Sequence, residues 1–245
     1  MTSLPAGTTC EIEAKSRMLD DSHDSHDPQA SHRVLPANHA GQMTPARLIH
    51  IYGRYAPLYD LMFGGVLEHG RRRMAKRVDE LKPASLLEIG VGTGLTLFRY
   101  PKESAVVGVD LSADMLSRAQ AKANRLTGRD ISLLTMDAEQ LSFPDNSFDC
   151  VTLPYVLSVT PNPLRLIQEI RRVCKTEGTI LILNHFSGSR FWWFLERAVR
   201  PLADRVGFRS DFSLEQYVIA HDWKIESVQS VNPFGLSKLI VVRNV

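Results

Sequence analysis

The stretch that decides the fold is Leu86-Leu87-Glu88-Ile89-Gly90-Val91-Gly92-Thr93-Gly94. A short apolar run of this kind is typical of a buried parallel strand, and the amphipathic residues 95–98 after the glycines predict a helix. Glycine lets the chain turn sharply and approach a ligand closely, and a helix N-terminus offers N–H groups to an anion or a carboxylate. The stretch therefore predicts a strand, a ligand-binding turn and a helix.

A second apolar run, residues 105–109, ends at Asp110. A carboxylate at this strand end can accept hydrogen bonds from both hydroxyls of a ribose. The glycine spacing then separates two classes of cofactor, because a dinucleotide motif counted from Gly90 requires glycine at the position that Leu95 occupies. The sequence therefore predicts a nucleotide-type cofactor, and the glycine spacing argues against NAD.

The chain has 245 residues, of which 44% are hydrophobic and 23% are charged, as expected for one globular domain with a tail. Residues 1–44 are rich in Asp, Ser, His and Pro without an apolar period, which predicts a disordered tail. The Asp-Ser-His repeat at 21–27 could hold a metal ion weakly, but a solvated acidic leader is favoured because nothing fixes a coordination geometry. We therefore expect no metal site.

The three cysteines, Cys10, Cys150 and Cys174, are odd in number and scattered, which argues against a disulfide framework or a zinc site. The last two lie in or beside apolar segments and are expected to be buried. No apolar stretch approaches the roughly 20 residues that a membrane-spanning helix needs, and the N-terminus lacks the pattern of a secretory signal. We expect the protein to stay inside the cell.

Strands and helices are predicted to alternate along residues 45–245. Two short helices at 45–63 and a helix at 66–81, ended by Pro83, form an N-terminal helical cap at 45–82. Further strands are expected at 131–136, 149–153 and 179–184, with helices at 113–126, capped by Ser112, and 164–174. Strands at 225–231 and 236–242 predict a C-terminal hairpin. The order predicts an α/β fold whose mostly parallel sheet ends in an antiparallel edge.

The pattern E-x-G-x-G-x-G at 88–94, followed by Asp110, resembles the first motif of class I S-adenosylmethionine-dependent methyltransferases. The stretches 143–149 and 166–178 and the order of elements from Tyr52 onward are also similar to that family. The resemblance implies a Rossmann-like fold with a seven-stranded sheet and S-adenosyl-L-methionine as the cofactor. It implies that Met136 lies near the adenine and that the cofactor contacts are Tyr59, Glu88, Gly90, Gly92, Gly94, Asp110, Leu111, Met115, Asp137, Ala138 and Pro154.

Three segments bear on the methyl acceptor. Residues 52–64, 155–163 and 183–186 resemble the bacterial phospholipid N-methyltransferases of the Rhodobacter type, which convert phosphatidylethanolamine stepwise to phosphatidylcholine. This resemblance implies phosphatidylethanolamine and its mono- and dimethyl derivatives as substrates. Quinone-pathway C-methyltransferases share a Tyr-Asp pair and the turn at 144–149, so a quinone or another small molecule remains the alternative acceptor.

Residues 190–200 combine aromatic side chains, which favour a membrane interface, with arginines, which favour anionic headgroups. We therefore interpret 186–222 as an insertion that faces the substrate or the membrane, the alternative being a cap helix with inward aromatics and solvated arginines. The basic helix Arg71–Arg77 could also touch a membrane, although a solvated face is favoured. No nucleic-acid module accompanies these charges. The expected partners are a phospholipid and an anionic membrane surface, at the inner face of the cytoplasmic membrane.

The expected chemistry is direct displacement at the sulfonium methyl, for which the protein must align an amine nitrogen and exclude water. The amine must be neutral to attack, so a proton acceptor helps. His185, just past the fifth strand, is the candidate base, with a hydrogen-bonded structural histidine as the alternative. Tyr52 and Tyr155 complete the predicted catalytic set. The aromatic face of Tyr52 suits the developing quaternary ammonium, with packing of a helical tyrosine as the alternative. The family resemblance implies that Tyr155 lies beside the reactive methyl.

Overall fold

The computed structural model describes residues 67–184, 224–232 and 237–245. The predicted tail at 1–44, residues 45–66 of the predicted cap and the predicted insertion at 186–222 lie outside the described residues. So do the candidate site residues Tyr52, Tyr59 and His185, whose roles stay predictions.

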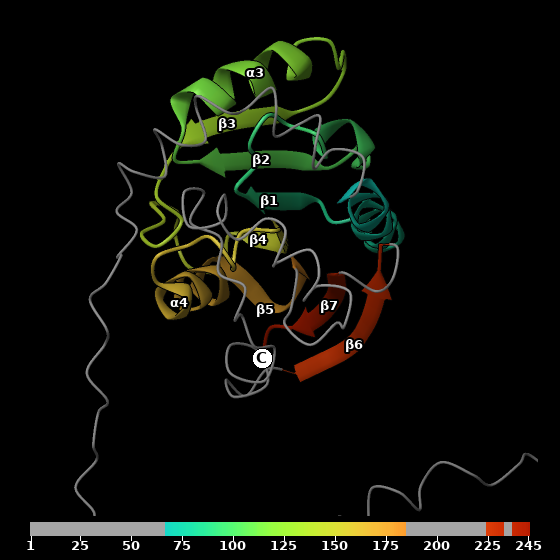
Figure 1. Ribbon diagram of the computed structural model, residues 1–245, viewed down its shortest axis with the longest axis vertical. Helices are drawn as coiled ribbons and strands as arrows, with labels where there is room; N and C mark the ends of the chain where they lie inside the picture. The colour runs from blue at the N-terminus through green and yellow to red at the C-terminus, as the bar shows by residue number, and fades with distance from the viewer. Residues whose placement is uncertain (1–66, 185–223, 233–236) are drawn as a thin grey trace, which may run out of the picture. The chain divides into compact units, whose positions relative to one another are not determined.

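A seven-stranded sheet with the order β3-β2-β1-β4-β5-β7-β6 forms the centre of the described structure (Figure 1). Strands β1 to β5 pair in parallel, and β7 pairs antiparallel with both β5 and β6. The predicted α/β class, with a mostly parallel sheet and an antiparallel C-terminal hairpin, is confirmed. The strands are β1 Ser85–Ile89, β2 Ala105–Asp110, β3 Ile131–Thr135, β4 Phe148–Pro154, β5 Cys174–Asn184, β6 Lys224–Val231 and β7 Ser237–Arg243.

The direction in which successive strands are added to the sheet reverses between β1 and β4. The chain runs from β1 outward through β2 to β3 and then returns to the other side of β1 with β4. In open parallel sheets, ligands bind beyond the carboxyl ends of the strands at such a reversal, because the connecting loops diverge there and leave a crevice. The topology therefore predicts a ligand-binding site at the carboxyl ends of β1, β2 and β4.

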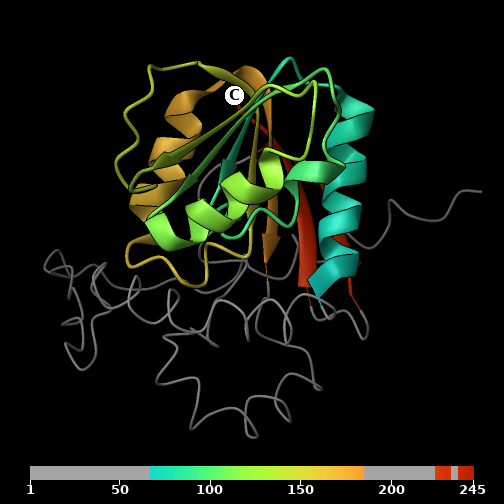
Figure 2. The same cartoon turned by 90° about the horizontal axis from the view of Figure 1, so that it is seen from above.

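Helices cover both faces of the sheet (Figure 2). The helix α4, Pro163–Val173, buries Leu166 and Ile170 against one face. The helix at 67–81, teal in both views, and α3, Ala113–Ala123, pack on the other face through residues such as Met74 and Leu116. The predicted cap of α3 is confirmed, since Ser112 Oγ accepts a hydrogen bond from the Met115 amide over 3.3 Å.

The prediction of a helix directly after the glycine turn is wrong. Only a short 3-10 turn, η1 at Leu97–Arg99, follows the glycines. The physical reason is Pro101, which disfavours helical conformation at the residue before it, and Tyr100 is accordingly extended, with φ −74° and ψ 157°. The turn must therefore bind its ligand with its own backbone groups instead of a helix N-terminus.

Other element boundaries differ by a few residues. The helix α3 ends at Ala123, before the predicted Leu126, and β5 begins at Cys174, earlier than the predicted 179. The expected burial of Cys150 and Cys174 is confirmed; both thiols are unbridged, and burial raises the pKa of Cys174 to about 12. Neither thiol is therefore set up for reactivity at neutral pH.

Candidate active site

A pocket of about 200 Å³ lies at the carboxyl ends of β1 to β4, where the strand order reverses. The pocket is lined by the turn after β1, by the segments that follow β2, β3 and β4, and by the helix at 67–81. The structure thus brings together sequence-predicted residues from distant parts of the chain. Those that line the pocket are Glu88, Gly90, Gly92, Asp110, Leu111, Met115, Asp137, Ala138, Pro154 and Tyr155, together with Met136.

Gly90 and Gly94 of the turn have different structural roles. Gly90 has a left-handed φ of 66°, and a Cβ there would collide with the side chain of Val156, so this position requires glycine on both counts. Gly94, with φ 77°, lies outside the pocket lining; a Cβ there would contact Ala119 of α3 at 3.1 Å. The structure therefore gives Gly94 a place in close packing, although it was predicted as a cofactor contact.

Asp110 is fixed by backbone donors on both of its oxygens. Its Oδ2 accepts from the Gly92 amide over 2.8 Å and its Oδ1 from the Ser112 amide over 2.9 Å. Burial raises the pKa of Asp110, while these amide hydrogen bonds lower it. Each carboxylate oxygen has a second lone pair, so the oriented side chain can still accept hydrogen bonds from two ribose hydroxyls.

Glu88 is a fully buried carboxylate in the pocket wall, and neither of its oxygens has a hydrogen-bond partner in the structure. Burial raises the pKa of Glu88 to about 8, against smaller lowering effects from the nearby Tyr100 and Thr96 hydroxyls and from Arg71. A buried acid without partners is costly unless a ligand satisfies it. The ammonium group of an amino-acid ligand would supply the missing donors and the opposite charge.

These features fit S-adenosylmethionine. The unsatisfied Glu88 suits the ammonium of its methionine part, Asp110 suits the ribose, and the segment at 136–138 supplies a wall for the adenine. When bound, the cofactor supplies an electrophilic methyl group. Among the described residues, no group of His, Cys, Asp and Glu side chains could hold a metal ion, and no helix is long and apolar enough to cross a membrane.

Arg71 is a pocket residue that was expected to lie in a solvated or membrane-facing basic helix. Its side chain is only 7% exposed and lines the pocket, so that expectation is wrong for Arg71. A sequence signal existed: Arg71 occupies the apolar stripe of its helix, at helical spacing from the buried Leu67, Met74 and Val78. A charged residue on such a stripe marks either a buried ion pair or a ligand contact.

Tyr155 follows β4 directly and adopts a left-handed φ of 64°, rare for a residue with a side chain. Its hydroxyl donates to the Leu67 carbonyl over 3.3 Å and accepts from Asn232 Nδ2 over 3.0 Å, and burial raises the pKa of the phenol. The phenol is therefore protonated at neutral pH and cannot act as a base. The ring already has a cation beside it, since the Arg71 guanidinium carbon lies 6.0 Å from the ring centroid.

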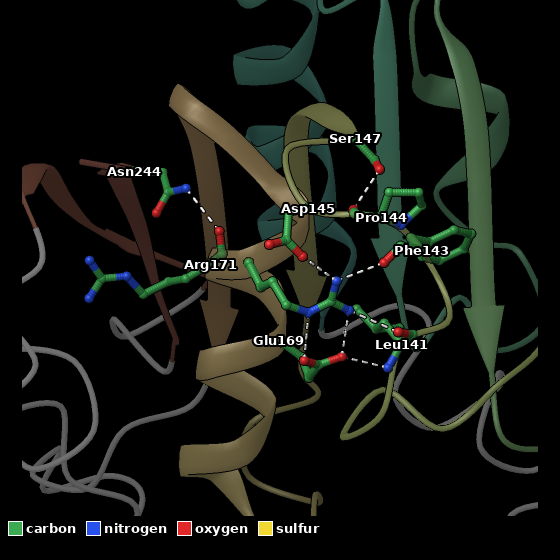
Figure 3. A network of polar contacts seen from close by, with 9 residues as sticks. Leu141, Phe143, Pro144, Asp145, Ser147, Glu169, Arg171 and Asn244 are labelled. Atoms are coloured by element: carbon green, nitrogen blue, oxygen red, sulfur yellow. Dashed lines mark hydrogen bonds and ion pairs between the residues drawn. The ribbon is translucent and has the colours of Figure 1, made fainter.

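A polar network that includes Leu141, Phe143, Asp145 and Glu169 holds the segment after β3 (Figure 3), and Arg172 of α4 is its main donor. Arg172 donates to the carbonyls of Leu141 and Phe143 and to the carboxylate of Asp145, over 2.7 to 2.8 Å. Glu169 accepts from Arg172 and also from the Leu141 amide over 2.7 Å. The two motifs at 143–149 and 166–178 are thus bonded to each other, and together they fix the chain that leads out of the pocket wall at 136–139.

Comparison with known proteins identifies the family of the chain. The family model described as a methyltransferase domain matches residues 87–182. A phosphatidylethanolamine N-methyltransferase from Cereibacter sphaeroides is 38% identical over 189 residues, which cover 76% of this chain and 91% of that protein. A 2-phytyl-1,4-naphtoquinone methyltransferase from Trichormus variabilis is 31% identical over 66% of this chain and 78% of that protein.

A solved structure supports the fold independently. A possible histamine N-methyltransferase from Thermotoga maritima superposes with a TM-score of 0.60 at 19% identity, covering 81% of this chain and all of that one. The chain therefore belongs to the class I S-adenosylmethionine-dependent methyltransferases.

Proposed function

We propose that this protein methylates the amine of phosphatidylethanolamine and of its mono- and dimethyl derivatives, and so produces phosphatidylcholine at the inner face of the cytoplasmic membrane. The observation that carries the proposal is the reach of the similarity to the Cereibacter sphaeroides phosphatidylethanolamine N-methyltransferase, which extends over 91% of that protein. The similarity to the naphtoquinone methyltransferase is lower in identity and covers 78% of that relative. Both relatives are methyltransferases, so the two alternatives differ in the molecule that accepts the methyl group.

The described pocket supports the first half of this reaction, which is to hold the methyl donor in a dry and ordered site. Glu88 and Asp110 place two acidic groups in the pocket lining, while Val156, Val159 and Pro161 add apolar wall. Such walls exclude water and strengthen the electrostatic interactions inside. The chain thereby lowers the entropy cost of aligning an amine with the methyl group.

Proton removal from the acceptor is assigned to His185 in this proposal. A protonated amine has no lone pair for the attack, so each methylation of an ammonium needs a proton acceptor. None of the described residues that line the pocket is a histidine, and burial raises the pKa of the Tyr155 phenol and so keeps it protonated.

The test is methyl transfer from radiolabelled S-adenosylmethionine to vesicles of phosphatidylethanolamine and phosphatidylglycerol. We expect labelled mono-, di- and trimethylated lipid to appear in that order, with sedimentation of the protein on anionic vesicles. Asp110→Ala serves as the control with impaired cofactor binding. Lipid without label, from folded protein that binds the cofactor, would overturn the proposal; label on a demethylated quinone in a parallel assay would then identify the alternative acceptor.

A further inference from the structure

Glu139 lines the methyl-donor pocket where two of its walls meet. It belongs to the wall at 136–139 that follows β3, and its side chain bonds to the loop at 155–162 that follows β4, which we call the post-β4 loop. Glu139 Oε1 accepts a hydrogen bond from the Thr160 hydroxyl and another from the Asn162 amide, each over 2.7 Å. One carboxylate oxygen therefore joins two walls of the pocket that are distant in sequence.

The two hydrogen bonds fix the end of the post-β4 loop where the loop enters α4. Thr160 is only 8% exposed, so removal of the carboxylate would leave its hydroxyl without this acceptor and largely away from water. Asn162 is the N-cap of α4, since its side chain accepts a hydrogen bond from the Arg165 amide over 3.1 Å. Hydrogen bonds to a carboxylate are roughly twice as strong as those between neutral groups. Glu139 therefore anchors both the loop and the start of α4.

The other end of the post-β4 loop is anchored at the glycine turn. Val156 packs so closely on Gly90 that a Cβ at this glycine would lie 2.4 Å from Val156 Cγ2. Between the two anchored ends, Val159 and Pro161 also line the pocket. The loop therefore follows the pocket from the glycine turn to the wall at 136–139.

This course brings the post-β4 loop past the reactive part of the cofactor. S-adenosylmethionine carries its sulfonium between its amino-acid part, which suits Glu88, and its nucleoside, whose adenine suits the wall at 136–138. In-line attack needs the acceptor nitrogen about 3–3.5 Å from the methyl carbon, and a misplacement of about 1 Å can cost roughly 100-fold in rate. The position of the loop therefore bears on the rate of methyl transfer.

The wall at 136–139 has hydrogen bonds that do not involve the Glu139 side chain. The Glu139 amide donates to Asp137 Oδ1 over 2.9 Å, and the Gln140 amide donates to the Asp137 carbonyl over 3.0 Å. A substitution that changes only the Glu139 side chain keeps both bonds. Loss of the carboxylate should therefore loosen the post-β4 loop and leave the adenine wall in place.

We propose that Glu139 is a positioning residue for methyl transfer, which holds the post-β4 loop against the bound cofactor so that the acceptor amine lies in line with the methyl group. In this role Glu139 does not touch the reacting atoms and acts through Thr160 and Asn162. The proposal rests on the proposed function for the choice of phosphatidylethanolamine as acceptor, whereas the geometry applies to any acceptor that enters beside the loop.

The test separates turnover from cofactor binding in Glu139→Gln, which keeps the shape of the side chain and removes its charge. With radiolabelled S-adenosylmethionine and phosphatidylethanolamine vesicles, kcat should fall about 10-fold because charge-assisted hydrogen bonds are lost. Affinity for S-adenosylhomocysteine, measured by titration calorimetry, should change by less than about twofold. Amide hydrogen exchange should become faster at 155–162 and stay unchanged in β1.

Glu103→Gln is the matched control, because it removes the same charge from an exposed position. It should leave kcat, cofactor affinity and hydrogen exchange as they are in the unmodified protein. A loss of S-adenosylhomocysteine affinity in Glu139→Gln as large as the loss of kcat would overturn the proposal, because Glu139 would then act on the cofactor. An unchanged kcat, or an unchanged exchange rate at 155–162, would overturn it as well.

Thr160→Val removes one of the two donors and carries the same test if Glu139→Gln does not fold. Alone it should lower kcat about threefold, and in the Glu139→Gln background it should have little further effect, because both substitutions break the same hydrogen bond. Fully additive effects would contradict the proposal. If the unmodified protein labels no phosphatidylethanolamine, the proposed acceptor fails, and the same comparison on a demethylated quinone decides the role of Glu139.

Discussion

The Gly92 amide donates a hydrogen bond to Asp110 Oδ2 over 2.8 Å, across 18 residues of sequence. The acid at the end of β2 therefore organises the glycine turn at the end of β1 as well as presenting its oxygens to the pocket. The Ser112 amide holds the other oxygen, so the carboxylate is oriented before a ligand arrives. Because folding already orders this carboxylate, ligand binding does not have to supply the entropy cost of ordering it.

Removal of this carboxylate should weaken cofactor binding twice over, through lost ribose contacts and a loosened turn. Asp110→Ala is expected to reduce affinity for S-adenosylhomocysteine by about 10- to 100-fold, since hydrogen bonds to charged groups contribute roughly 1.5–3 kcal/mol. Titration calorimetry measures the change. Asp114→Ala, an exposed acid in the first turn of α3, is the control. Equal affinities for the two variants would contradict the assignment.

Cofactor affinity should rise with pH because of Glu88. Burial raises the pKa of its carboxyl to about 8, so in the ligand-free protein it is largely protonated at pH 7, whereas an ammonium ligand pairs with the ionised form. Between about pH 6 and pH 8 the affinity should increase by up to about tenfold per unit, with release of a proton. Calorimetry in two buffers of different ionisation enthalpy detects that proton.

Glu88→Gln should bind more weakly and lose this pH dependence, whereas the exposed Glu103→Gln should keep it. A steep pH dependence that survives in Glu88→Gln would assign the proton to another group. An affinity that does not vary with pH in the unmodified protein would refute the coupling.

Two glycines with similar backbone angles separate steric from conformational effects. Gly90 and Gly128 have φ values of 66° and 71°, but an added Cβ collides with Val156 at Gly90 and meets open space at Gly128. Gly128→Ala should cost about 1 kcal/mol, the strain of a left-handed alanine, whereas Gly90→Ala should cost about 3 kcal/mol and abolish cofactor binding. Urea unfolding compares them. Equal destabilisation would show that the Val156 contact relaxes freely.

Arg172 should contribute strongly to stability through the carbonyls that it holds. Arg172→Ala leaves the Leu141 and Phe143 carbonyls and the Glu169 carboxylate without this donor, and about 3 kcal/mol of unfolding free energy should be lost. Equilibrium denaturation measures the loss. Arg165→Ala, an exposed arginine in the first turn of the same helix, should change stability by less than about 0.5 kcal/mol. A similar effect of the two substitutions would contradict the role of the network.

The glycine turn, Asp110 and the parallel strands were predictable from sequence because they depend on local patterns, namely apolar runs, glycine spacing and an acid at a strand end. The 3-10 turn after Gly94 was not predicted because the amphipathic pattern at 95–98 favours a helix, whereas Pro101, seven residues after Gly94, prevents one. Arg71 had a local signal that was not used, its place at helical spacing between the buried Leu67 and Met74. The orientation of Tyr155 depends on long-range packing, because its hydroxyl accepts a hydrogen bond from the amide of Asn232, and no local pattern carries that information.

The buried Glu88 makes the stability of this protein depend on pH and on bound methyl donor. Because its folded pKa of about 8 exceeds its ordinary value of 4.5, its stabilising effect in the ligand-free protein is present below about pH 4.5 and declines as pH rises towards 8. A bound ammonium reverses that loss, and a ligand selective for the folded state adds its binding energy to stability. When methyl donor is scarce, more of the protein unfolds transiently and becomes open to proteases, so the abundance of the enzyme would follow the availability of its donor.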